Sequence, residues 1–279
     1  RKKLYMGNIH GGCINVDRIE QNGATYRGFG EPDFITPENV RQAAINAMNA
    51  GHTHYTASGG IPELKAAVCA AYQRDYGLKF AANQVLISCG AKHSIHNVIS
   101  SLCGPGDEVI IPAPYWVSYP DITLLAEATP VIVEAKQKNG FKITPAQLSK
   151  AITKKTKLFV LNSPSNPTGA AYTKAELEAL AQVIVKKDIA VLSDEIYEKL
   201  VYPEVEPGLR HFSPGSMPAL AGRTITLNGM SKAFAMTGWR IGYVCAPGLG
   251  GRFMQELVKL QGQMTNNIPA FFMPAIVEA

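Results

Sequence analysis

Short apolar runs alternate with helical patterns along this chain from about residue 38 onward. The run 83–88 is typical of a buried strand, and after it the apolar residues Ile95, Val98 and Ile99 recur at helical spacing. Further strand-like runs lie at 108–111, 158–161, 189–192 and 224–227. Such alternation predicts a largely parallel α/β sheet with helices on both faces.

Composition and charge exclude several classes of protein. The chain has 279 residues, of which 46% are hydrophobic, so it has ample material for a buried core. No apolar run is as long as a membrane span, and no apolar signal core follows the basic N-terminus. The net charge of +5 is spread along the chain, without a nucleic-acid-binding module. We therefore expect neither a membrane nor a nucleic acid as partner, and a cytoplasmic protein, with the plastid stroma or another organelle matrix as the alternative.

Metal and nucleotide motifs are also not supported. The five cysteines are odd in number and include no Cys-x-x-Cys pair. The histidine pairs, His52 with His54 and His93 with His96, lack carboxylate or cysteine companions. A Gly-x-Gly sequence at 28–30 lacks the third glycine of a dinucleotide fingerprint. We expect no metal and no nucleotide cofactor.

Polar, glycine-rich stretches follow four of the predicted strands. In open sheets of this kind, ligands bind beyond the carboxyl ends of the strands, so these stretches form the candidate site. They read Ser-Cys-Gly-Ala-Lys at 88–92, Asn-Ser-Pro-Ser-Asn-Pro-Thr-Gly at 162–169, Ser-Asp-Glu-Ile-Tyr at 193–197 and Asn-Gly-Met-Ser-Lys at 228–232.

Seven stretches, in this order along the chain, resemble the class I/II aminotransferases of the fold-type I pyridoxal-phosphate superfamily. They are 30–34 with 36–37, 55–56 with 60–64, 105–109, 114–119, 162–169, 193–198 and 231–242. The likeness is greatest to the branch of prokaryotic-type aspartate and glutamate/aspartate-prephenate aminotransferases, which includes plastid forms. It implies a three-layer, aminotransferase-like large domain with a mostly parallel sheet. This domain, residues 31–279, would bind pyridoxal 5′-phosphate and follow a poorly matched N-terminal segment, residues 1–30.

The resemblance implies roles for four residues around the cofactor ring. Lys232 would bond the cofactor aldehyde and move a proton, for which an amine needs a pKa lowered by nearby charge or desolvation. Asp194 would keep the ring nitrogen protonated; a carboxylate that ends an apolar run needs a cationic partner when it is buried. The Tyr197 hydroxyl and the Asn166 amide would hydrogen-bond the phenolate oxygen of the cofactor. The alternatives are a solvated surface lysine and a helix N-cap aspartate.

The phosphate is assigned to a second group by the same resemblance. Arg240 and Ser231 would bind it, together with the backbone amides of Ala91 and Lys92 at the start of a predicted helix. The alternative for the Lys92 side chain is a solvated charge. Gly229 stands where some relatives carry a serine for the phosphate, so that oxygen ligand is absent or supplied elsewhere.

Further contacts are implied for the substrate and for a second subunit. Trp116 would stack on the cofactor ring, with an ordinary core tryptophan as the alternative. Gly30, Trp116 and Asn166 would contact the substrate. Tyr55 would reach the phosphate of a partner subunit, which implies a homodimer with shared active sites.

The predicted function is transfer of an amino group from aspartate or glutamate to a 2-oxo acid by a ping-pong mechanism. The acceptor would be 2-oxoglutarate, oxaloacetate or prephenate. The family's arginine for the substrate α-carboxylate belongs to a small C-terminal domain, which we expect to be incomplete or missing because the chain ends at Ala279. Two alternatives stay open: another fold-type I enzyme, such as a lyase or a synthase, and a non-catalytic fragment that binds the cofactor.

Overall fold

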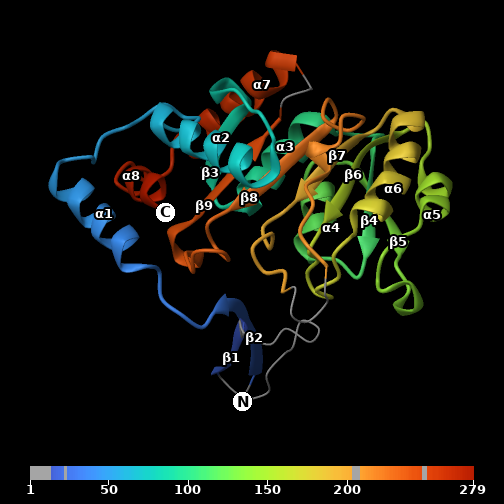
Figure 1. Cartoon of the computed structure of the whole chain (residues 1–279), viewed down its shortest axis with the longest axis horizontal. Coiled ribbons are helices and arrows are strands. Elements are labelled where there is room, and N and C mark those ends of the chain that lie inside the picture. Colours follow the sequence, from blue (N-terminus) through green and yellow to red (C-terminus); the bar gives the residue numbers. More distant parts are fainter. Residues whose placement is uncertain (1–13, 22–23, 203–207, 247–249) are drawn as a thin grey trace.

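A seven-stranded sheet, in the order β3-β9-β8-β7-β6-β4-β5, lies at the centre of the chain (Figure 1). The structure is a computed structural model that describes residues 14–21, 24–202, 208–246 and 250–279. The strands of this sheet are β3 (Val85–Cys89), β4 (Glu108–Ala113), β5 (Thr129–Glu134), β6 (Thr156–Asn162), β7 (Ala190–Asp194), β8 (Thr224–Gly229) and β9 (Ile241–Cys245). The helices are α1 (Glu38–Asn49), α2 (Pro62–Tyr76), α3 (Ala91–Leu102), α4 (Ser118–Leu125), α5 (Pro145–Ala151), α6 (Lys174–Lys187), α7 (Gly250–Met264) and α8 (Phe272–Glu278). Short 3-10 helices lie at Ala82–Gln84, Gln137–Asn139, Pro214–Ser216 and Thr237–Trp239.

Most neighbouring strands of the sheet are parallel, as the alternation of strand and helix patterns predicted. β5, β4, β6, β7 and β8 pair in parallel, whereas β9 runs antiparallel to both β3 and β8. The connection from β8 to β9, residues 230–240, contains no α-helix. Antiparallel neighbours can be joined by such a short connection, while a parallel crossover needs a dozen or more residues. Its reversed direction brings the start of β9 to the edge of the sheet where β3 and β8 end.

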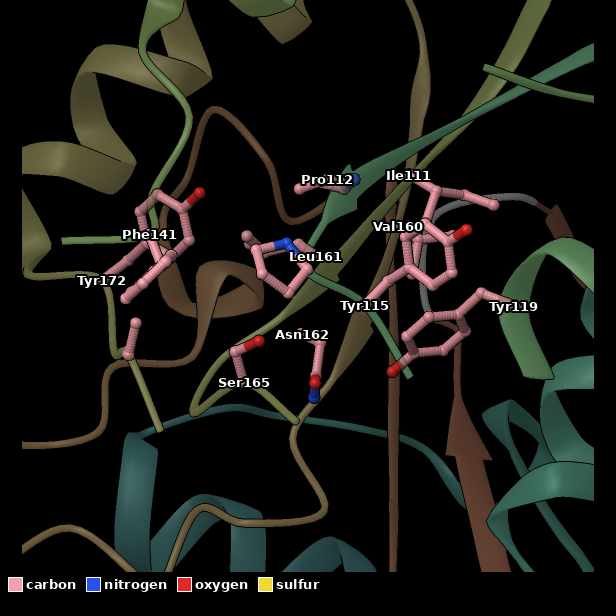
Figure 2. A pocket seen from close by; sticks show the side chains of 12 residues that line it. Ile111, Pro112, Tyr115, Tyr119, Phe141, Val160, Leu161, Asn162, Ser165 and Tyr172 are labelled. Atoms are coloured by element: carbon pink, nitrogen blue, oxygen red, sulfur yellow. The ribbon is translucent and has the colours of Figure 1, made fainter. Parts of the chain in front are cut away.

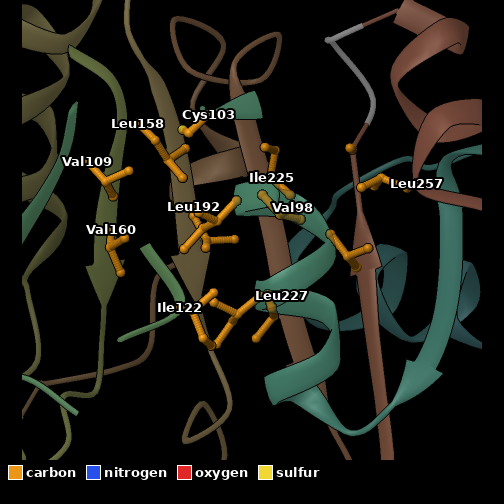
Figure 3. Close-up of a cluster of buried hydrophobic side chains, with 14 of the residues drawn as sticks. Val98, Cys103, Val109, Ile122, Leu158, Val160, Leu192, Ile225, Leu227 and Leu257 are labelled. Atoms are coloured by element: carbon orange, nitrogen blue, oxygen red, sulfur yellow. The ribbon is translucent and has the colours of Figure 1, made fainter. Parts of the chain in front are cut away.

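The sheet is covered by helices on both faces. Along β6, the side chains of Leu158 and Val160 pack into a cluster with α3, α4 and α7, which Figure 3 shows from within. Phe159 and Leu161 pack on the opposite face against α5 and α6. On that opposite face, α1, α2 and α8 cover the β3–β9 end of the sheet. Alternate residues of each strand point to opposite faces of the sheet, and each face is covered by helices. This arrangement confirms the three-layer α/β fold predicted from the sequence.

Local signals account for the helix that leads into β7. Helix α6 begins with a capping box, in which the Thr173 hydroxyl accepts from the Glu176 amide and the Glu176 carboxylate accepts from the Thr173 amide. It ends at Asp188, whose φ of 55° lies in the left-handed region that stops a helix. The apolar residues that follow form β7 and place Asp194 at its carboxyl end.

A two-stranded antiparallel hairpin, β1 (Ile14–Gln21) with β2 (Ala24–Pro32), lies outside the main sheet (Figure 1). The N-terminal segment expected at 1–30 therefore falls partly in this hairpin, and its residues 1–13 and 22–23 lie outside the described residues. In the part of the chain that the structure describes, no helix is long and apolar enough to cross a membrane.

Candidate active site

The polar ends of β6, β7 and β8 meet at one edge of the sheet. Asn162 and Asp194, the last residues of β6 and β7, are register partners, and Gly229 at the end of β8 is opposite Gly242 of β9. Lys232 follows β8 after a short turn, and Arg240 directly precedes β9. Asn162 and Asp194 lie together because β6 and β7 are parallel and end at the same edge. Arg240 lies at that edge because β9 is antiparallel and begins there.

The Lys232 amine lies inside this edge rather than on the surface. Its Nζ donates a hydrogen bond of 2.6 Å to the carbonyl oxygen of Gly30 and lies 5.8 Å from the centre of the Tyr197 ring. Burial lowers the pKa of Lys232; the charge of Arg240 lowers it further and that of Glu31 raises it. Lys232 therefore gives up its proton more readily than a solvated lysine, as its implied role requires.

The Asp194 carboxylate is only 3% exposed and has two hydrogen-bond donors. The Tyr119 hydroxyl donates to Oδ2 at 2.7 Å, and the Ile196 amide donates to Oδ1 at 3.2 Å. None of the ion pairs among the described residues includes Asp194. Burial raises the pKa of Asp194 to about 6, and Glu195 raises it as well, while the two hydrogen bonds lower it. This is a buried acid without a cation, an arrangement that favours binding of a cationic group.

Tyr197 and Asn166 lie together next to these two residues. The Asn166 Nδ2 donates to the Tyr197 hydroxyl at 3.4 Å, and the Asn166 amide donates to Asn162 Oδ1 at 2.7 Å. Burial raises the pKa of Tyr197 to about 12, helped by the Asp194 charge. The segment after β7 forms consecutive turns.

A second group lies where β3 passes into α3. Gly90, with a φ of 84°, precedes the helix, and α3 begins at Ala91 without a side-chain N-cap, as expected from the sequence. A Cβ atom at Gly90 would overlap the Arg240 guanidinium, and one at Gly242 would overlap the Ala91 amide nitrogen. Gly90 thus leaves room for the Arg240 guanidinium, and Gly242 leaves room for the backbone at the start of α3. Backbone amides, a helix dipole and a guanidinium are groups that favour the binding of an anion.

The other predicted residues are placed differently. The Trp116 ring packs edge-on against Tyr119, with 5.3 Å between ring centres, and the exposed Lys92 amine lies 5.0 Å over the Trp116 ring. Ser231 is buried beside Lys232. Tyr55 is not brought into the group, because its side chain is 87% exposed in the loop between α1 and α2.

Sequence reasoning missed a buried network behind the turn after β7. Glu195 Oε1 accepts hydrogen bonds from the hydroxyls of Ser193 and Ser213, both at 2.8 Å, and Oε2 lies 3.0 Å from His211 Nε2. Glu195, Glu198 and His211 form a cluster of possible metal ligands. Because Glu195 already has three protein partners, we interpret the network as a support for the turn that follows Asp194. The sequence offered no local signal for His211, which is 16 residues away from Glu195.

A small pocket lies next to this group, beyond the carboxyl ends of β4 and β6. Figure 2 shows Tyr115 and Tyr119 on one side of the pocket, with Phe141 and Tyr172 on the other. None of the site residues predicted from the sequence lines it. Tyr119 belongs to both places, since its ring lines the pocket and its hydroxyl contacts Asp194.

Comparison with known proteins agrees with this arrangement. The chain is 49% identical over 254 residues to the aspartate/prephenate aminotransferase of Cereibacter sphaeroides, a match that covers 90% of this chain and 62% of that protein. It is 50% identical over 221 residues to the aspartate aminotransferase of Geobacillus stearothermophilus, a match that covers 79% of this chain and 55% of that protein. The structure of Thermus thermophilus aspartate aminotransferase with maleate is similar with a TM-score of 0.85 and 42% identity, covering 90% of this chain and 63% of that one.

This chain thus spans about six tenths of the length of the relatives it matches. The family described as aminotransferase class I and II matches residues 27–279, nearly the whole chain. With the strand order, the lysine after β8 and the buried acid at the end of β7, this match establishes that the chain belongs to the class I and II aminotransferase family.

Proposed function

We propose that this chain carries the cofactor site of an enzyme that uses pyridoxal 5′-phosphate to move an amino group from aspartate or glutamate to a 2-oxo acid. The acceptor in this proposal is 2-oxoglutarate, oxaloacetate or prephenate. The observation that carries it is the buried Asp194, which has no cationic partner among the described residues and lies at the same sheet edge as an amine of lowered pKa, Lys232.

The two groups at this edge fit the two ends of that cofactor. Asp194 fits a protonated ring nitrogen, because a cation would compensate its buried charge. The Arg240 guanidinium, together with the open start of α3, fits a phosphate, for which planar donors and helix amides are suited. Tyr197 and Asn166 offer donors for a phenolate oxygen between them. We assign the remaining phosphate contact to Ser231.

Each residue then has a chemical task. Bound pyridoxal phosphate supplies an aldehyde that bonds amino groups and a ring that withdraws electrons from the adjoining carbon. The Lys232 amine would take the proton from the substrate Cα and deliver it to C4′ of the cofactor, which its lowered pKa favours. Asp194 would keep the ring nitrogen of the bound cofactor positive, and Trp116 would cover one face of its ring. Gly30, Trp116 and Asn166 are proposed to contact the substrate.

The donor and acceptor are inferred from the relatives. Two of them are named for aspartate or prephenate, and a third was solved with the dicarboxylate maleate. We assign no residue of this chain to the substrate α-carboxylate. We also propose a homodimer, in which the exposed Tyr55 reaches the partner's phosphate, and a cytoplasmic or organelle-matrix location.

Cofactor binding is tested by titrating the protein with pyridoxal phosphate, reducing the mixture with borohydride and mapping the modified peptide. We expect a visible absorbance band and one covalent label on Lys232. The Lys232→Ala variant should bind the cofactor through Arg240 and α3 without becoming labelled. No spectral change, or a label on Lys92 instead, would contradict the assignment.

Amino-group transfer is tested by mixing the loaded protein with a single amino acid and following the absorbance of the bound cofactor. Aspartate and glutamate should convert it, and alanine should do so far more slowly. Release of ammonia or loss of a side-chain group would indicate a lyase or synthase instead.

A further inference from the structure

We propose that Tyr119 is a positioning residue for Asp194: its hydroxyl holds the carboxylate in the orientation and the charge state that a cationic ring nitrogen needs. This inference rests on the proposed function. It adds a residue from α4 that the sequence motif contained without an assigned task.

The contact is short, buried and directed. Tyr119 is 2% exposed, and its hydroxyl hydrogen bond to Asp194 Oδ2 measures 2.7 Å. On the other oxygen, the backbone amide of Ile196 donates at 3.2 Å. A carboxylate offers about four acceptor positions, so two donors fix its rotation and leave positions free for a ligand. Of these two donors, only the tyrosine is a side chain that substitution can remove.

The hydroxyl also acts on the charge of Asp194. A hydrogen bond donated to a carboxylate favours the ionised form, whereas burial and a neighbouring negative charge disfavour it. The groups that face Asp194 are Tyr119 from α4, and Glu195 and Tyr197 from the turn after β7. Burial and the Glu195 charge both raise the pKa of Asp194, and the Tyr119 hydroxyl opposes them. Loss of that hydroxyl would therefore raise the pKa further, and the carboxylate would hold its proton at higher pH.

The ring and the hydroxyl of Tyr119 have separable tasks. The ring packs edge-on against Trp116 and lines the small pocket, while the hydroxyl contacts Asp194. Tyr119→Phe keeps the ring and removes the donor. A matched control is Tyr172→Phe, because Tyr172 lines the same pocket, is also buried, and its hydroxyl accepts a 2.9 Å hydrogen bond from the Ile143 amide without contacting Asp194.

The first measurement uses the cofactor-free protein. Its stability to denaturant should fall with rising pH until Asp194 is fully ionised. The pH range over which stability falls is the pH window of Asp194. Tyr119→Phe should move the upper end of this pH window upward by about one unit. Tyr172→Phe should lower stability evenly, without moving the window. A Tyr119→Phe window identical to that of the unmodified protein would overturn the inference, even if the proposed function holds.

The second measurement is the affinity for pyridoxal phosphate at pH 7.5. Tyr119→Phe should weaken it by about tenfold or more, the effect expected for a lost hydrogen bond to a charged group, and Tyr172→Phe should change it little. In the Asp194→Asn background the same Tyr119→Phe change should have almost no effect, because its target charge is gone. Equal losses in both backgrounds would show that Tyr119 acts through packing alone. Failure of the unmodified protein to bind the cofactor would instead contradict the proposed function, and the pH window would still test the Tyr119–Asp194 contact.

Discussion

The two ends of the candidate cofactor site are built in opposite ways. At the Asp194 end, the charged group is buried, and its hydrogen-bond partner Tyr119 comes from another layer of the fold. At the Arg240 end, the charged group is exposed, and it lies beside the backbone at the start of α3 with glycines making room. The first end holds a charge that burial destabilises, and the second holds a charge that water still solvates.

This difference predicts how each end responds to change. A buried charge without a partner interacts strongly with its ligand and with protons, because water does not screen it. An exposed cation and helix amides interact more weakly and are screened by salt. Substitutions at the Asp194 end should therefore change catalysis and the pH dependence of stability. Substitutions at the Arg240 end should mainly change cofactor affinity.

The largest effect is expected for Asp194→Asn. Removing one partner of a buried ion pair costs about 3 to 5 kcal/mol, which corresponds to a decrease of about 10² to 10⁴-fold in the rate of amino-group transfer. Single-turnover mixing with aspartate measures it. Glu195→Gln is a useful comparison, because it perturbs the adjacent buried carboxylate without touching the ring nitrogen site. An Asp194→Asn rate close to that of the unmodified protein would show that another group holds the ring nitrogen.

The next effect concerns the stability of the cofactor-free protein. The pKa of Asp194 is about 6 in the folded state and about 3.9 when unfolded, so the folded protein binds the proton more tightly. The free energy of unfolding should therefore fall by about 3 kcal/mol as the pH rises from about 4 to about 6. Denaturant unfolding at several pH values measures how the free energy of unfolding changes with pH. Asp194→Asn should remove the part of this slope that Asp194 causes. An unchanged slope in the variant would assign the slope to other groups, such as Glu198, whose pKa burial also raises.

A smaller effect is expected at the other end, for Gly90→Ala. The φ of 84° at Gly90 is strained for alanine by about 1 to 3 kcal/mol, and the added Cβ displaces the Arg240 guanidinium. We expect affinity for pyridoxal phosphate to fall by about tenfold. Gly77→Ala is the matched control, since Gly77 also has a positive φ, ends α2, and would place its Cβ in open space. If both variants bind the cofactor equally well, Gly90 does not position Arg240.

The smallest effect is expected for Lys92→Met. Lys92 is exposed, and its amine lies 5.0 Å over the Trp116 ring, an interaction worth about 0.5 to 1 kcal/mol. Cofactor affinity should change less than about fivefold, and added salt should reduce the difference. Lys174→Met is the control, because Lys174 lies 5.6 Å over Phe212. A much larger loss for Lys92→Met would make its side chain a direct phosphate ligand.

Several parts of the fold were predictable from short stretches of sequence. The apolar runs at 158–161 and 189–192 correspond to β6 and β7, and the helix predicted after Gly90 begins at Ala91. Strand β9 was not predicted as a strand, since its five residues follow a motif rich in glycine and turns. Its antiparallel direction was not predictable either, because periodicity contains no information about strand direction.

The candidate site also has residues that the sequence predicted and residues that it did not. The positions of Lys232 and Asp194 followed from the rule that ligands bind beyond strand ends. Tyr119 was missed, although it lies three residues after Trp116 at the start of a helix, a spacing that puts two side chains near each other.

The sequence by itself determined five strands of the main sheet, β3, β4, β6, β7 and β8, and the polar residues that follow them, since both depend on neighbours a few residues apart. Only the tertiary structure decided which of those residues meet. The partner of Asp194 is 75 positions away, and the carbonyl oxygen that accepts from Lys232 is 202 positions away. The pKa changes of Asp194 and Lys232 were likewise decided there, because burial, their largest cause, depends on how the layers pack.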